Sequence, residues 1–135
     1  MSTPSKVNIN VSQLSASASK ASARDHHIIM DRPPEKGGEN KGPLGGETFL
    51  MAFGGCFMSN LLAAGQARET PLSDVRLDIS GTIDDTPARF VAIELTVSAP
   101  RTDPQTLEKL MTIAERGCLV ANTLKQALDL TIIAA

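Results

Sequence analysis

Hydrophobic and polar residues alternate in two places within the first third of the chain. Val7, Ile9 and Val11 alternate with polar residues, which is the period of a half-buried strand. Residues 27–30 predict a second strand that pairs with the first, across a serine- and alanine-rich segment with the character of a turn or a weak strand. Residues 32–46 are rich in proline and glycine and show no apolar period, so they predict a loop.

The next segment, residues 49–65, is apolar on nearly every helical face and is interrupted only by Ser59 and Asn60. It is shorter than the roughly 20 residues of a membrane span and longer than an ordinary strand. A helix that is apolar all round belongs in a protein interior. Gly54 and Gly55 lower helix propensity, so we expect another backbone to come close there, from this chain or a partner subunit.

Alternation returns in the second half of the chain. Apolar residues alternate with polar ones over residues 75–79 and again over residues 91–97, with turn-forming residues between the two runs. Two such runs joined by a short polar connection predict an antiparallel hairpin with one face in the core.

Helical periodicity follows this hairpin. Asp103 has the position of an N-cap before a proline, and Gly117 has the position of a C′ glycine that ends the helix. A short helix is expected over residues 119–127 and a closing strand over residues 128–132. The predicted order β-β-α-β-β-α-α-β indicates an α+β fold, with helices packed on a sheet and one domain spanning residues 1–135.

Composition narrows the function classes. The 135 residues are 41% apolar and carry a net charge of −2, so no basic surface favours nucleic acid or an anionic membrane. The first 20 residues lack the apolar core of a secretion signal. We therefore expect a cytoplasmic protein whose two cysteines are reduced by default.

The two cysteines lie in different settings. Cys56 is in the middle of the apolar helix, where it reacts only if a cation from elsewhere in the fold stabilises its thiolate. Cys118 begins the short helix, where free backbone N–H groups and the helix dipole favour a thiolate. The alternative is that both are buried, inert small hydrophobes. Candidate cations are Arg24 and Arg32, which flank the second strand, and Lys20 and Arg116.

Three ordered segments resemble the OsmC/Ohr family of osmotically inducible and organic hydroperoxide resistance proteins. GPLGGETFLMAFGGCFMSNLLAAGQAR is similar to the central helix of that family, and IAERGCLVANTLKQALDLTI to its second cysteine motif. MDRPPEKGGENKGP resembles a loop of the OsmC-like branch. The order of the segments and the separation of the two cysteines also fit the family.

This resemblance implies an α+β homodimer with a two-layer arrangement of antiparallel sheet and helices around a long central apolar helix. The subunits are intertwined and the active sites lie at their interface. Cys56 is then the peroxidatic and Cys118 the resolving cysteine of a thiol-dependent peroxidase in oxidative-stress defence. The implied substrate is an organic, lipid-like hydroperoxide, and the implied reductant is a lipoyl-type dithiol or a small thiol. The resemblance implies no metal and no organic cofactor.

The sequence also departs from the family pattern. Active members carry a glutamate ten residues before the peroxidatic cysteine, where this chain has Gly46, with Glu47 one position later. The arginine that stabilises the thiolate corresponds to Arg24 or Arg32, and Leu119 replaces the usual proline after the second cysteine. These departures leave an alternative open, a non-catalytic OsmC-like dimer that binds a small apolar ligand.

Overall fold

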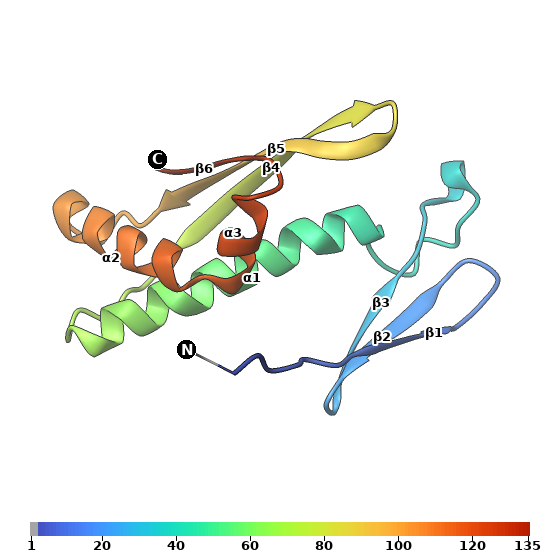
Figure 1. Ribbon diagram of the computed structural model, residues 1–135, viewed down its shortest axis with the longest axis horizontal. Coiled ribbons are helices and arrows are strands. Elements are labelled where there is room, and N and C mark those ends of the chain that lie inside the picture. Colours follow the sequence, from blue (N-terminus) through green and yellow to red (C-terminus); the bar gives the residue numbers. More distant parts are fainter. Residues whose placement is uncertain (1–2) are drawn as a thin grey trace. The chain divides into compact units, whose positions relative to one another are not determined.

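The computed structural model describes residues 3–135, which form two compact units. The first unit ends at Phe49 and the second runs from Leu50 to Ala135. The long helix α1 (Gly45–Ala67) begins in the first unit and continues through the second (Figure 1). The expectation of one domain stays a prediction.

The first unit contains a three-stranded antiparallel sheet in the order β1-β2-β3. Its strands are β1 (Asn10–Gln13), β2 (Ser19–Ala23) and β3 (His26–Met30). The expected pairing of the first strand with residues 27–30 is wrong, because the serine- and alanine-rich segment forms the central strand between them. A two-residue turn joins β2 to β3, and Arg24 adopts a left-handed φ of 54° there. The β1 residues remain exposed, so this strand is not half-buried in the single chain.

A buried carboxylate organises the loop between β3 and α1, which includes the 3₁₀ turn η1 (Pro34–Lys36). Asp31 accepts hydrogen bonds from the backbone N–H groups of Arg32 (2.7 Å), Glu39 (3.2 Å) and Lys41 (3.2 Å). Burial raises the pKa of the Asp31 carboxyl, but these hydrogen bonds outweigh that effect and the pKa is lowered overall. One charged side chain therefore satisfies three backbone donors of a glycine-rich loop.

The second unit contains the predicted hairpin and the predicted helices. Strands β4 (Arg76–Asp85) and β5 (Ala88–Ser98) are antiparallel. Two helices follow, α2 (Pro104–Gly117) and α3 (Leu119–Leu124), and then β6 (Asp129–Ala134).

The closing strand makes the second sheet mixed rather than wholly antiparallel. β6 lies parallel to β5, and the sheet order is β4-β5-β6. Parallel neighbours need a crossover connection, which α2 and α3 supply. The short helix α3 ends at Leu124, earlier than expected, because the chain turns there to enter β6, with Leu128 N–H donating to Leu124 O at 3.1 Å.

The core of the second unit lies between α1, the sheet and α2 (Figure 1). Phe53, Phe57 and Leu61 follow one another at four-residue intervals on α1 and are fully buried. They belong to the same cluster as Leu95 of β5 and Leu110 of α2. Burial of each such side chain contributes about 1.5–3 kcal/mol, so this face fixes α1 within the unit.

The opposite face of α1 is apolar and exposed. Met51 is 57% and Leu62 36% exposed. The expectation of a helix buried all round is therefore met on one face only. Within residues 3–135, α1 is the one helix long and apolar enough to cross a membrane by length and composition, a test that core helices of soluble proteins also pass.

The glycine pair of α1 divides between these two faces. A Cβ on Gly54 would lie 2.6 Å from Ile79 Cδ1, so the close neighbour is a side chain of β4 rather than another backbone. A Cβ on Gly55 would meet nothing within 4 Å.

Gly65 near the end of α1 gives a test of this packing. A Cβ there would lie 2.7 Å from the Thr70 carbonyl oxygen, which is backbone and cannot rotate away. We expect Gly65→Ala to lower the free energy of unfolding by about 1–2 kcal/mol, despite its gain in helix propensity. Gly45→Ala is the matched control, because a Cβ at Gly45 has open space. Urea denaturation at a fixed protein concentration measures both, and equal stability of the two variants would contradict the packing argument.

Candidate active site

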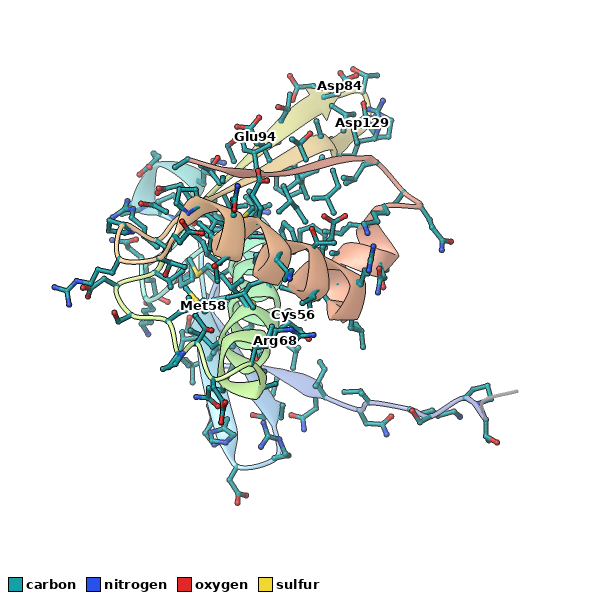
Figure 2. All side chains as sticks on the ribbon, turned by 90° about the vertical axis from the view of Figure 1, so that its left-hand side faces the viewer. Cys56, Met58, Arg68, Asp84, Glu94 and Asp129 are labelled. Carbon is teal, nitrogen blue, oxygen red and sulfur yellow. The ribbon has the colours of Figure 1, made fainter. Side chains whose placement is uncertain are left out.

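Two elements position the candidate cysteines in the second unit. Cys56 projects from the middle of α1 and is half-buried (Figure 2). Cys118 joins α2 to α3 and is fully buried. Its backbone is extended, with φ −81° and ψ 111°, and its Sγ accepts a hydrogen bond from the Ala121 N–H at 3.5 Å. Cys118 is thus the N-cap residue of α3.

The two thiols are in contact. Cys118 Sγ lies 3.3 Å from Cys56 Sγ, with Cys118 as the donor, and both cysteines are free. A disulfide bond measures about 2.05 Å, so about 1.2 Å of approach closes it. The fold therefore brings together two sulfurs that lie 62 residues apart in the sequence.

Burial decides the protonation of the second thiol. It raises the pKa of Cys118 more than the hydrogen bond from the Ala121 N–H lowers it, and the neighbouring Cys56 raises it further. The backbone N–H groups at the helix start lower the pKa of Cys118, as expected, but desolvation outweighs them, so the pKa is raised overall. The raised pKa favours the protonated Cys118 thiol, which is the donor in the contact with Cys56 Sγ.

Asn60 is a third polar group at this site. Its Nδ2 donates to the Cys56 carbonyl oxygen at 2.9 Å and lies 4.0 Å from Cys56 Sγ. Its Oδ1 would be 3.1 Å from a Cβ on Gly117, the residue before Cys118. Gly117 is the last residue of α2 and not a C′ glycine, since Cys118 is the C-cap. Its missing side chain makes room for the Asn60 carboxamide.

The other predicted site residues belong to the first unit. The Glu47 carboxylate accepts from the Leu44 N–H at 2.8 Å, which caps the start of α1. Arg24 lies in the β2–β3 turn and Arg32 follows the buried Asp31. Both arginines are exposed and, within residues 3–135, neither forms a salt bridge. Their roles toward the thiol pair stay predictions.

Several charged groups of the second unit lie away from Cys56. Arg68 donates to the Ala64 carbonyl at 3.5 Å and lies twelve residues after Cys56, about 18 Å along α1. Figure 2 shows Asp84, Glu94 and Asp129 on the sheet, well separated from Cys56. Among residues 3–135, no group of three or more His, Cys, Asp or Glu side chains could hold a metal ion. The groups that the structure shows in contact at this site are two thiols and the neutral Asn60 carboxamide.

The structure therefore shows an α+β fold in which a long helix places one thiol against a second, buried thiol. The sequence profile of the OsmC-like protein family matches residues 38–133. The chain belongs to this family.

Solved structures share the fold across the whole chain. An OsmC like protein from Mycoplasma pneumoniae superposes with a TM-score of 0.82 at 16% identity, covering 98% of each chain. An organic hydroperoxide resistance protein OsmC from Legionella pneumophila gives 0.73 at 17% identity and 99% coverage of each. One from Elizabethkingia anophelis gives 0.72 at 15% identity, covering 100% of this chain and 99% of that one. A comparison with functionally curated proteins finds no match.

The raised pKa of Cys118 predicts an alkaline loss of stability. The folded protein holds this proton above the pH at which the unfolded thiol, with a pKa of about 8.5, releases it. The unfolding free energy should therefore fall as pH rises from that value through the folded pKa. Cys118→Ser should flatten this decline, whereas Cys56→Ser should retain its larger part, since burial is the first cause of the shift. Urea titrations from pH 7 to 10 measure it, and the absence of tyrosine simplifies the comparison.

Proposed function

We propose that the chain is a thiol-dependent peroxidase that reduces organic hydroperoxides with Cys56 and Cys118. The observation that carries the proposal is the 3.3 Å contact between a half-buried and a fully buried thiol. Membership of the OsmC-like family, and structural neighbours named organic hydroperoxide resistance proteins, support a role in peroxide detoxification.

The greater exposure of Cys56 supports it as the residue of the first step. Its thiolate attacks the terminal oxygen of the hydroperoxide, an S–O bond forms, and the O–O bond breaks. The alkoxide leaves and takes up a proton to become an alcohol. Sulfur loses two electrons to the peroxide, and Cys56 becomes a sulfenic acid. The Cys118 S–H, which donates to the Cys56 sulfur, stabilises negative charge there before the attack.

The contact between the two sulfurs supports Cys118 as the residue of the second step. Its sulfur attacks the Cys56 sulfenic acid, an S–S bond forms, the S–O bond breaks, and hydroxide leaves with the Cys118 proton as water. An external dithiol then reduces the disulfide by two exchange reactions and is itself oxidised to a disulfide. The chain returns to its dithiol state, ready for the next hydroperoxide.

The apolar-ligand alternative explains less of the site. It accounts for the exposed apolar face of α1 and for the absence of a glutamate at position 46. It gives no role to two free thiols in contact, one of which has its protonation set by burial. The contact between the thiols therefore favours the peroxidase.

Single cysteine substitutions test the two roles. Cys56→Ser should lower the rate of tert-butyl hydroperoxide consumption with a dithiol reductant by about a thousandfold or more, as loss of a catalytic nucleophile does. Cys118→Ser should still consume about one equivalent of peroxide and accumulate a sulfenic acid that dimedone traps. Equal turnover by wild type and Cys56→Ser would refute the proposal.

We also propose that the protein works as a homodimer with the exposed face of α1 at the interface. Met51 and Leu62 are exposed in the single chain, and Gly55 between them has open space at its Cα. A glycine on an apolar helix face allows a second helix to approach closely. Burial of this face in a partner subunit removes apolar surface from water, which is the usual driving force for association.

The oligomeric state of a charged variant tests this interface. Leu62→Arg should shift the mass measured by light scattering from dimer toward monomer, because the guanidinium would be desolvated in an apolar interface. Thr112→Arg is the control, since Thr112 is exposed on α2. Circular dichroism should show equal helix content in both variants. A Leu62→Arg protein that remains dimeric would place the interface elsewhere.

A further inference from the structure

Asn60 interrupts the most apolar helix of the chain, and the proposed reaction of Cys56 and Cys118 gives this residue no role. Asparagine is a poor residue for a helix interior, because its side chain competes for backbone hydrogen bonds. Here it bonds the carbonyl four residues back, which belongs to Cys56, at 2.9 Å. This bond aims the carboxamide along α1 toward the thiol, with Nδ2 4.0 Å from Cys56 Sγ.

The other end of the same carboxamide faces the segment that carries Cys118. Asn60 Oδ1 would lie 3.1 Å from a Cβ at Gly117, closer than most side chains tolerate. Gly117 has no left-handed φ that would demand glycine, so the space taken by Asn60 is the local reason for a residue without a side chain. The Asn60 carboxamide therefore fills the space between the Cys56 carbonyl on α1 and Gly117 at the end of α2.

We propose that Asn60 is a positioning residue that holds the two thiols in register and donates its N–H to the Cys56 sulfur when that sulfur is charged or oxidised. In the reduced pair the 4.0 Å contact is long for a hydrogen bond. A thiolate or a sulfenate oxygen draws the donor in, and a hydrogen bond to a charged acceptor is stronger than one to a neutral acceptor. Asn60 thus acts on the second step, in which the Cys118 sulfur displaces hydroxide from Cys56.

The charged residues next to Cys118 do not compete with Asn60 for the hydrogen bond to the Cys56 sulfur. On the elements that flank the pair, Glu115 is engaged by Lys125 at 2.8 Å and Arg116 is exposed. Cys118 contacts Cys56, and burial raises the pKa of its thiol, which favours the neutral form.

The first test measures closure of the disulfide by itself. Diamide oxidises a dithiol without peroxide: Cys56 adds to its N=N bond, Cys118 displaces the resulting hydrazine, and the S–S bond forms. We expect closure in Asn60→Ala to be about threefold to tenfold slower, the loss of one modest hydrogen bond. Asn60→Asp should be slower still, because it places a negative charge beside the sulfur. Ser59→Ala, on the neighbouring exposed position, should close at the wild-type rate.

Gly117 supplies a second test that leaves both cysteines and Asn60 in place. Gly117→Ala should slow closure by pushing the carboxamide aside, and it should add nothing in the Asn60→Ala background, where the space is free. Both single variants should fold, because alanine favours each helix more than the residue it replaces. Additive effects of the two substitutions would contradict the claim that Gly117 acts by leaving space for the Asn60 carboxamide. An Asn60→Ala variant that closes at the wild-type rate would overturn the positioning role.

The role of Asn60 rests on the proposed peroxidase activity only in the experiment with hydroperoxide. With tert-butyl hydroperoxide, Asn60→Ala should trap more dimedone-reactive sulfenic acid than wild type, because its second step is slower. A wild-type protein that closes with diamide and ignores hydroperoxide would refute the peroxidase, while the diamide series would still decide the role of Asn60. Equal sulfenic acid trapping in both proteins during active peroxide reduction would count against Asn60.

Discussion

The burial of one face of α1 against β5 and α2 is the constraint on which the site depends. Phe53 and Phe57 are fully buried on either side of Cys56 in sequence, so the helix cannot rotate without exposing them. Rotation is therefore fixed, and Cys56 is held at the edge of this core, half-buried. The same core buries Cys118 completely at the α2–α3 junction. A difference in exposure between two touching thiols is thus a consequence of ordinary packing.

The difference in exposure makes the two thiols chemically unequal. A buried thiol resists ionisation because its thiolate loses the solvation of water, and the neighbouring sulfur adds to this resistance. Burial therefore favours the protonated form of Cys118. Cys56 is partly exposed to solvent and accepts a hydrogen bond from the Cys118 thiol. Leu119 stands where the family resemblance predicts proline. The Ala121 and Val120 N–H groups that follow it lower the pKa of Cys118, but they do not overcome burial.

The spacing of hydrophobic residues predicts most of this fold. It fails for a strand that has few hydrophobic residues and for a pairing set by a long crossover. The hairpin of β4 and β5 and the helix α2 follow from strong two- and three-to-four-residue periods. Apart from Lys20, strand β2 carries only small serine and alanine side chains, so its place between β1 and β3 depends on backbone hydrogen bonds that leave no pattern of hydrophobic residues. The parallel pairing of β6 depends on a crossover, which the sequence of one strand does not encode.

The site could be predicted to the level of the two cysteines, because the ordered resemblance includes them both. Their contact could not, since a pairing over 62 residues is decided by how α1 and α2 pack on a common sheet. Asn60 was visible as a polar interruption of an apolar helix, and Gly117 as a glycine before a cysteine. The link between them is the space one leaves for the other, a three-dimensional relation that explains both residues at once. In the apolar middle of α1, the Asn60 carboxamide beside Cys56 supplies a hydrogen-bond donor without adding charge to the core.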